Sequence, residues 1–246
     1  MTSYSEAILI RGLSFLSDKQ AAIANNLANV DTASFKRRIS VAKEASHDFQ
    51  SMLDAHMPAV AYSEQSDFGR GILRETGNRF DIAVDGSFWL RVRNASGQDY
   101  YTRNGQLQIN QNGEVVTRDG LKLLDNAGNP IQVGAGDSAP SDFVVSPNGT
   151  IQDPTTGESW GPIAMVDLPE PESLQPVGRG LYADPKQQEG KQAGDGVRQG
   201  FLEGSNVDSL QELVAMITVE RSFSATQKAL NAASRLQENI ITNVLR

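Results

Sequence analysis

The chain of 246 residues contains no cysteine and has a formal net charge of -8, from 22 basic and 30 acidic residues. The lack of cysteine excludes disulfides, thiolate metal sites and cysteine nucleophiles, and the negative charge disfavours a nucleic acid partner because it repels a phosphate backbone. The length is enough for a large apolar core without covalent cross-links.

The amino-terminal residues predict neither a signal peptide nor a membrane anchor. Met1 is followed by Thr-Ser-Tyr-Ser-Glu, so the basic and apolar regions of a signal peptide are missing. No window of the sequence approaches the roughly 18 apolar residues of a membrane span. We therefore expect no cleaved signal and no membrane insertion.

Residues 1–35 predict a long amphipathic helix. Ser3 and Glu6 have the spacing of a capping box, which indicates a helix start at this point. Apolar residues then recur at alternating intervals of four and three, the spacing of a coiled-coil seam. This N-terminal seam consists of Leu9, Leu13, Leu16, Ile23, Leu27 and Val30, with the polar Gln20 at one position.

Residues 36–68 show neither a helical nor a strand period, so we expect an extended connector. The only two histidines, His47 and His56, lie in this stretch. Because no carboxylates cluster around them at ligand spacing, we expect neither a metal site nor a cofactor.

Residues 69–205 predict an all-β domain. Short runs rich in valine, isoleucine and aromatic residues are separated by glycine turns every 8 to 12 residues or so, which is typical of such domains. Asn112-Gly113 and Asn148-Gly149 predict hairpins with type I′ turns, in which both central residues have a positive φ. The expected strands are 80–84, 88–93, 100–102, 107–110, 114–117, 121–124, 143–145, 150–152 and 163–167.

The sequence carries no convincing catalytic motif. Asp81 and Asp85 would share one face of a strand and could form a pair of carboxylates. Since Asp85-Gly86 is a turn former, we expect these aspartates to bond nearby backbone groups rather than to act as a catalytic acid and base. A nucleophile elbow and a phosphate-binding loop are both absent, so we expect no enzyme activity and no small-molecule substrate.

Residues 206–246 predict a second long helix, because no glycine or proline occurs from Val207 to Arg246. Ser209 and Glu212 have the spacing of a second capping box. The C-terminal seam consists of Met216, Val219, Phe223, Thr226, Leu230, Ala233, Gln237, Ile240 and Val244. A further apolar set, which includes Leu213, Ile217 and Leu236, widens the apolar face and predicts more than one partner helix.

Together these elements predict an α+β fold, with N- and C-terminal helices forming a coiled-coil core and a central all-β domain inserted between them. The core would contain residues 1–35 and 206–246, the connector residues 36–68, and the outer domain residues 69–205. Seams that one subunit buries incompletely drive association with further copies. A helical stalk that carries a β-domain binding module, such as a surface adhesin, is an alternative with the same architecture.

Four stretches of the sequence resemble the bacterial flagellar basal-body rod and hook protein family. They are residues 24–36 (ANNLANVDTASFK), 76–86 (TGNRFDIAVDG), 101–105 (YTRNG) and 202–207 (LEGSNV), the last leading into Met216, Ile217 and Arg221. The family usually has glycine where this chain has Ser34. The resemblance assigns an assembly motif to Asn25, Asn26, Leu27, Ala28, Asn29, Thr32, Phe35 and Lys36, and a C-terminal motif to Glu203, Ser205, Asn206, Val207 and Arg221.

The resemblance implies a structural subunit of the basal-body rod that transmits torque from motor to hook. The proximal-rod class is the most similar, with distal-rod or hook-type proteins as alternatives. Its partners would be copies of itself, other rod proteins and the flagellar type III export apparatus. Such a subunit is exported without a cleaved signal, and its terminal helices line the inside of the periplasm-spanning rod.

Overall fold

The computed structural model describes residues 4–44, 60–134, 142–192 and 194–244. They form an N-terminal helix, a central β-rich region and a C-terminal helix, so the fold is α+β. The chain divides into two compact units. The helical unit contains residues 1–30, 37–67 and 207–246, and the β unit contains residues 31–36 and 68–206.

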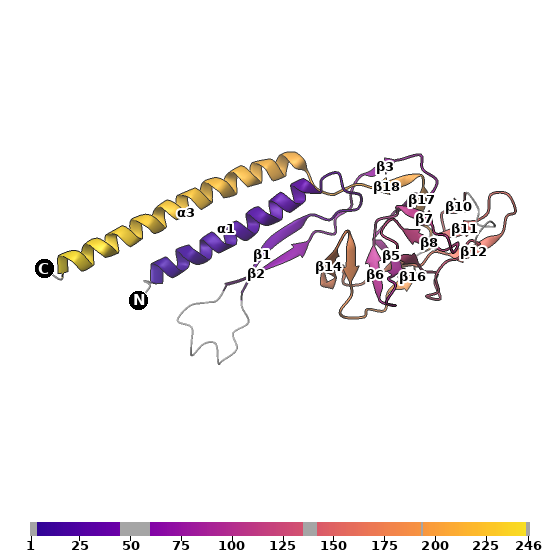
Figure 1. The fold of residues 1–246 in the computed structure, drawn as a ribbon, viewed down its shortest axis with the longest axis horizontal. Helices are drawn as coiled ribbons and strands as arrows, with labels where there is room; N and C mark the ends of the chain where they lie inside the picture. The colour runs from indigo at the N-terminus through magenta and orange to yellow at the C-terminus, as the bar shows by residue number, and fades with distance from the viewer. Residues whose placement is uncertain (1–3, 45–59, 135–141, 193, 245–246) are drawn as a thin grey trace. The chain divides into compact units, whose positions relative to one another are not determined.

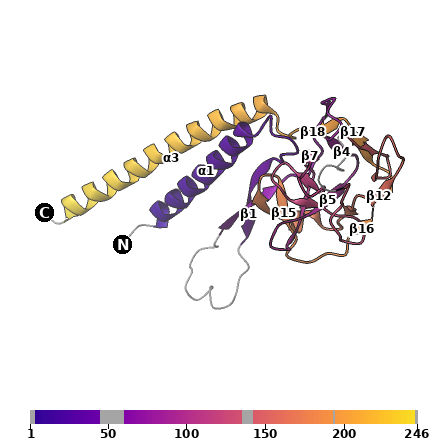
Figure 2. The same ribbon diagram turned by 45° about the vertical axis from the view of Figure 1, so that its right-hand side comes forward.

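The helical unit contains helix α1 (Tyr4–Ala28) and helix α3 (Ser209–Val244), which pack side by side (Figures 1 and 2). We expected the first helix to continue to residue 35, but it ends at Ala28. Ser34 has a φ of 57°, which a right-handed helix cannot contain. The side-chain amide of Asn29 donates to the carbonyl of Asn25 at 2.8 Å and so satisfies a backbone group at the helix end.

The start of α3 is set by Asp208 rather than by the expected capping box. Oδ1 of Asp208 accepts hydrogen bonds from the backbone N–H groups of Leu210 at 2.9 Å and Gln211 at 3.1 Å. Ser209 is therefore the first helical residue and not the N-cap, so the helix begins one position earlier than the capping box predicts. Glu212, the other residue of the expected capping box, is buried, and its side chain accepts hydrogen bonds from Arg37 and Asn26. In the first helix, Ser3 lies outside the described residues.

We expect Asp208→Ala to lower the free energy of unfolding of the helical unit by about 1 kcal/mol, because two N–H groups of α3 lose their acceptor. Thermal unfolding followed by circular dichroism measures this loss. Asp208→Asn, which keeps a side-chain oxygen, should retain most of the stability. Equal losses in the two variants would show that Asp208 acts through its charge and not as a cap.

The stretch that we expected to be an extended connector contains two paired strands. Strands β1 (Arg38–Glu44) and β2 (Val60–Ser66) run antiparallel, and β1 packs on α1 within the helical unit. Residues 45–59, including His47 and His56, lie outside the described residues.

The β unit consists of short antiparallel strands. Its largest sheet has the order β14-β15-β6-β5-β9-β8-β7, with β13 pairing with both β5 and β16. A second sheet has the order β10-β11-β12, and the pairs β17-β4 and β18-β3 complete the unit. The strands are β3 (Leu73–Glu75), β4 (Ile82–Val84), β5 (Phe88–Arg93), β6 (Asp99–Thr102), β7 (Leu107–Ile109), β8 (Val115–Thr117), β9 (Lys122–Leu123), β10 (Val144–Val145), β11 (Thr150–Gln152), β12 (Ser159–Pro162), β13 (Met165–Asp167), β14 (Gln175–Gly178), β15 (Leu181–Ala183), β16 (Lys191–Gln192), β17 (Val197–Gln199) and β18 (Phe201–Glu203), with a short 3₁₀ helix at Pro171–Ser173.

The core of the β unit is built from the inward side chains of these strands. Its fully buried members include Ile82, Leu90, Leu123, Phe143 and Ile163. A smaller cluster surrounds an aromatic triangle of Phe68, Trp89 and Tyr182, whose ring centroids lie 5.2 to 5.4 Å apart with edge-to-face angles.

The two predicted hairpins exist, but their turns are not of type I′. Of the turn residues, Gly113 has a φ of 74° and Gly149 a φ of 82°, whereas Asn112 and Asn148 are not among the residues with positive φ. The N–H of Gly113 donates to the carbonyl of Asn110, and that of Gly149 donates to the carbonyl of Ser146. Each turn therefore begins two residues before the asparagine, and only the glycine needs a left-handed backbone.

Candidate assembly site

The two seams lie on the less exposed faces of α1 and α3. In α3, Val219 is buried, and Met216, Phe223, Thr226, Leu230 and Ala233 are half-buried. In α1, Ile23 is buried, Leu9, Leu13, Leu16 and Leu27 are half-buried, and the polar Gln20 is exposed. Ile240 and Val244 belong to α3, but their side chains lie outside the described residues. The contribution of each seam residue to assembly stays a prediction.

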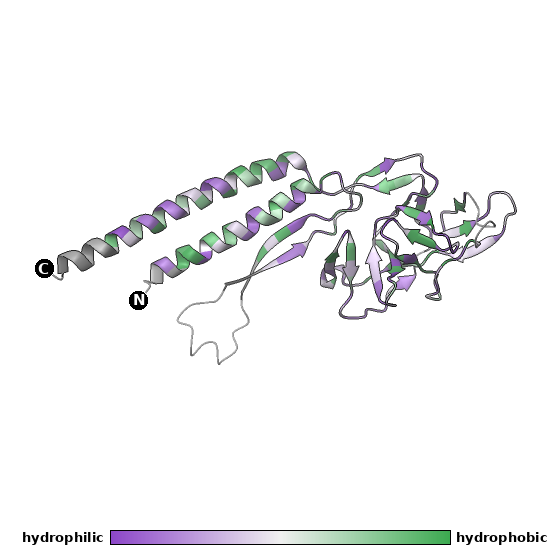
Figure 3. Ribbon diagram, in the orientation of Figure 1, coloured by the Kyte–Doolittle hydropathy of each residue, from purple (hydrophilic) through white to green (hydrophobic). Residues whose placement is uncertain are grey.

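Both helices also expose large apolar side chains. On α3, Leu210, Leu213, Val214, Ile217 and Leu236 have exposed fractions between 45% and 69%. On α1, Ile8 and Ile10 are each half exposed, and Figure 3 shows hydrophobic residues on α1 and near the start of α3. Apolar groups of this size outside a core mark a surface suited to association.

The two terminal motifs each contain a point where the chain passes from one unit to the other, after residue 30 and after residue 206. Their residues therefore divide into two groups. One group belongs to the helical unit and surrounds Glu212. The other belongs to the β unit and surrounds Glu203.

The Glu212 cluster consists of Asn26, Arg37, Arg38 and Glu212. Glu212 is fully buried and accepts hydrogen bonds from Nε of Arg37 at 2.5 Å and from Nδ2 of Asn26 at 3.3 Å. The amide of Asn26 also bonds both backbone groups of Arg38, accepting from its N–H at 2.8 Å and donating to its carbonyl at 2.9 Å. One side chain thus connects the end of α1, the start of β1 and the first turn of α3.

The Glu203 cluster consists of Ser34, Lys36, Gly71, Arg103 and Glu203. Oε1 of Glu203 accepts from Nζ of Lys36 at 2.7 Å and from the N–H of Gly71 at 2.8 Å, and Oε2 accepts from Nε of Arg103 at 2.6 Å. Burial works against ionisation of Glu203, but the charges of Arg103 and Lys36 outweigh it and hold the pKa of this carboxyl below its usual value.

Ser34 occupies a backbone conformation that favours glycine. Its φ is 57°, which costs a residue with a Cβ about 1 kcal/mol or more. Its hydroxyl donates to the carbonyl of Arg103 at 2.7 Å, and its N–H donates to the carbonyl of Glu203 at 2.8 Å. These bonds give a reason why serine is tolerated where the family usually has glycine.

Arg103 is a site residue that the sequence analysis did not single out, although it lies inside a quoted motif. Its guanidinium donates to the carbonyls of Val84, Gly86 and Phe88 and lies 5.8 Å from the ring centroid of Trp89. Because its donors are almost all used inside the β unit, a lysine could not replace it.

The remaining motif residues have varied surroundings. The N–H of Asn206 donates to the carbonyl of Phe35 at 3.3 Å, and its amide donates to the carbonyl of Gly69 at 3.1 Å. Val207 is buried and Ser205 is half-buried, whereas Ala28, Thr32 and Arg221 are exposed.

The two candidate carboxylates have separate partners. Asp81 accepts from Nδ2 of Asn78 at 3.1 Å, while Asp85 lies 3.4 Å from Nη1 of Arg70 and 3.2 Å from Nη2 of Arg198. Among the described residues, no three or more His, Cys, Asp or Glu side chains are grouped as metal ligands. No helix in the described ranges is long and apolar enough to cross a membrane.

Three family models match the chain in sequence order. "Flagella basal body rod protein" matches residues 8–36, "Flagellar hook protein FlgE/F/G D1 domain" matches residues 83–153, and "Flagellar basal body rod FlgEFG protein C-terminal" matches residues 198–243. Each description concerns the rod or hook of the flagellum, so the class is that of flagellar axial proteins.

Full-length relatives point to the rod. The flagellar basal-body rod protein FlgG of Buchnera aphidicola subsp. Schizaphis graminum is 28% identical, over 89% of this chain and 91% of the relative. FlgG of Agrobacterium fabrum is 25% identical over 97% and 98% of the two chains, and FlgF of Caulobacter vibrioides is 25% identical over 89% of each. Over most of its length, the chain is therefore similar to flagellar basal-body rod proteins. FlgF and FlgG match at similar identity, and the comparisons give no support to a surface adhesin.

Proposed function

We propose that this chain is a structural subunit of the flagellar basal-body rod that assembles through its terminal helices. The observation that carries the proposal is that α1 and α3 pack on each other and still expose large apolar side chains. Burial of these side chains against further helices is favourable. In the assembled rod, the helices would form a coiled-coil core with those of neighbouring subunits, and residues 69–205 would form the outer domain.

The partners of the subunit are copies of itself and other rod proteins, and its role is to transmit torque rather than to catalyse a reaction. We place it in the proximal rod, as for FlgF, with the distal rod of FlgG as the alternative. Delivery would occur through the flagellar type III export apparatus without a cleaved signal. The names of the relatives and the order of the matching family models support the assignment to the rod.

We expect Leu213→Glu combined with Ile217→Glu to abolish incorporation into basal bodies, because two new charges lie on an apolar face that assembly would bury. Quantifying the chain in isolated basal bodies measures the effect. Both side chains are about half exposed, so the isolated subunit should keep its fold. Gln227→Glu, at an exposed polar position of α3, is the matched control.

The proposed function fails if the unaltered chain is absent from isolated basal bodies. The role of the apolar face fails separately if the double variant is incorporated as well as the Gln227→Glu control.

A further inference from the structure

The chain contains three asparagines that are directly followed by glycine, at Asn104, Asn112 and Asn148. Two of these pairs form the turns of the β7-β8 and β10-β11 hairpins, and the third lies between β6 and β7. A following glycine makes an asparagine prone to lose its side-chain amide, because the glycine nitrogen can approach the asparagine Cγ without hindrance from a Cβ. The fold surrounds the three pairs differently, so it decides which of them reacts.

The reaction begins when the backbone nitrogen of the glycine attacks Cγ of the asparagine. A bond forms between this nitrogen and Cγ, the bond from Cγ to Nδ2 breaks, and the proton of the glycine N–H leaves with the amide as ammonia. Water then opens the resulting imide ring. Aspartate forms if water cleaves the bond between Cγ and the nitrogen. Isoaspartate, with a longer backbone, forms if water cleaves the bond between the main-chain carbonyl carbon and the nitrogen.

The pair at Asn104 is restrained on both sides. Asn104 is half-buried, its N–H donates to Oγ1 of Thr102 at 3.1 Å, and its Oδ1 accepts from the N–H of Gln106 at 3.2 Å. The carbonyl of Gly105 accepts from the N–H of Ile82 at 3.0 Å, and a Cβ at Gly105 would lie 1.9 Å from the carbonyl oxygen of Ile82. The buried backbone of Gly105 therefore has no room to turn toward Cγ.

The pair at Asn148 is exposed, but its side chain is bonded within the turn. Oδ1 of Asn148 accepts from the N–H of Thr150 at 3.1 Å. Gly149 is buried, its carbonyl accepts from the N–H of Ile163 at 2.9 Å, and a Cβ at Gly149 would lie 3.2 Å from Cε of Met165. Attack on Cγ therefore has to break the side-chain hydrogen bond first.

The pair at Asn112 is the least restrained of the three. The Asn112 side chain is exposed and makes no hydrogen bond in the part of the chain that the structure describes, although its N–H donates to Oδ1 of Asn110 at 2.9 Å. The N–H of Gly113 donates to the carbonyl of Asn110 at 2.9 Å, and the corresponding bond is present in the turn at Asn148. Local opening of the turn is thus needed in both hairpins, and the side chain makes the difference.

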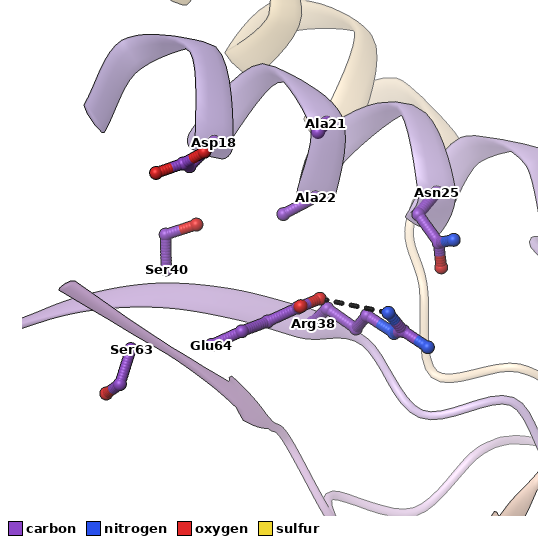
Figure 4. Close-up of a pocket in the computed structure, with 8 residues that line it drawn as sticks. All are labelled: Asp18, Ala21, Ala22, Asn25, Arg38, Ser40, Ser63 and Glu64. Atoms are coloured by element: carbon purple, nitrogen blue, oxygen red, sulfur yellow. Dashed lines mark hydrogen bonds and ion pairs between the residues drawn. The ribbon is translucent and has the colours of Figure 1, made fainter. Parts of the chain in front are cut away.

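An asparagine on a helix shows that an unbonded side-chain oxygen alone is not sufficient. Figure 4 shows Asn25 on α1, where it lines a pocket together with Arg38 and Glu64. Oδ1 of Asn25 has no partner among the described residues. The next residue, Asn26, has a Cβ and lies within the helix, whose N–H groups are bonded to carbonyls one turn earlier. Attack on Cγ of Asn25 would break the helix at this point.

We propose that Asn112 is a deamidation site, and that it reacts before the other two Asn-Gly pairs. It combines an exposed, unbonded carboxamide with a following glycine, which no other asparagine in the described ranges does. The reaction needs water and neither an enzyme nor a partner protein.

Deamidation of Asn112 changes the turn in two ways. It adds a carboxylate two positions before Glu114, and the isoaspartate form lengthens the backbone before Gly113. The carbonyl of Gly113 accepts from the N–H of Val133 at 2.7 Å, and Val133 belongs to the buried core. The modification therefore reaches a hydrogen bond at the edge of the core, although the turn itself is exposed.

Peptide mapping by mass spectrometry measures the conversion at each site after the purified full-length chain is incubated in mildly alkaline buffer. We expect Asn112 to convert about threefold or more faster than Asn148, which must first lose a side-chain hydrogen bond. It should convert at least about tenfold faster than Asn104, which must also open a buried segment. Asn112→Gln should remove conversion at this position, because the longer side chain would have to close a larger ring, and should leave the other two rates unchanged.

The same incubation in guanidinium chloride is the control, because unfolding removes the hydrogen bonds that distinguish the three sites. The three rates should then lie within about threefold of one another. Equal rates in the folded chain, or faster conversion at Asn104 or Asn148, would overturn the proposal. Rate differences that persist unchanged in guanidinium chloride would overturn it too, since neighbouring residues and not the fold would then set the order.

Discussion

Replacing Glu203 with glutamine should lower the free energy of unfolding of the β unit by about 3 to 5 kcal/mol, because it leaves two buried cations without their counterion. Glu203 is 1% exposed, and its oxygens lie 2.7 Å from Nζ of Lys36 and 2.6 Å from Nε of Arg103. Lys36 and Arg103 are themselves buried. Glutamine fills the same space, so the loss reports charge rather than packing.

Urea unfolding followed by tryptophan fluorescence measures this effect, since Trp89 lies beside Arg103 in the same unit. Glu189→Gln, which makes the same chemical change at an exposed position, should cost less than about 0.5 kcal/mol. Adding Lys36→Met to Glu203→Gln should restore part of the stability, because one of the two unpaired cations is removed. A loss equal to that of the Glu189→Gln control would refute the role of the cluster.

The pH dependence of stability gives a second readout of the same cluster. The pKa of Glu203 is lower in the folded protein than its usual value, because the attraction of Arg103 and Lys36 outweighs the opposing effect of burial. A carboxyl of this kind stabilises the fold above its unfolded-state pKa, and the contribution is lost as the pH falls through the folded-state pKa. The difference between the unaltered chain and Glu203→Gln should therefore shrink in acid.

The helices and many of the central strands were predictable because their signals are local. The strand predicted at 88–93 has the same bounds as β5, and the seven-residue pattern of the C-terminal helix identifies α3. The N-cap was misassigned by one residue because Asp208 and Ser209 are both good caps and lie next to each other. The strands at β1 and β2, and those from β14 onward, carry too few apolar residues for their period to stand out.

The charged clusters could not be predicted, because their members lie far apart in the sequence. Lys36 and Arg103 are 167 and 100 residues from Glu203, and Asn26 is 186 residues from Glu212. No periodicity connects such positions. The assembly motif marked Asn26 and Lys36 through family resemblance, but it did not reveal what each side chain bonds, and Arg103 went unmarked as a site residue.

Asn26→Asp should lower the free energy of unfolding of the helical unit by about 3 to 5 kcal/mol at neutral pH, although it changes a single NH₂ group to oxygen. Nδ2 of Asn26 donates to the carbonyl of Arg38 at 2.9 Å and to Oε2 of Glu212 at 3.3 Å. The new carboxylate has no N–H to donate, so it would repel the carbonyl oxygen of Arg38 and the carboxylate of Glu212. Two buried carboxylates at this distance cannot both ionise without a large cost, although Arg37 offsets part of it through Glu212.

Helix melting followed by far-ultraviolet circular dichroism measures the loss, with Asn231→Asp at an exposed position of α3 as the control. The sign of the pH dependence separates repulsion from misfolding. Repulsion by Glu212 raises the pKa of the new carboxyl in the folded state. The penalty is therefore complete above that pKa, shrinks as the pH falls from it, and is gone below the unfolded value of about 3.9. A protonated carboxyl can also donate to Glu212 again. A penalty that stays constant into acid would mean that charge repulsion between the new carboxyl and Glu212 is not its cause.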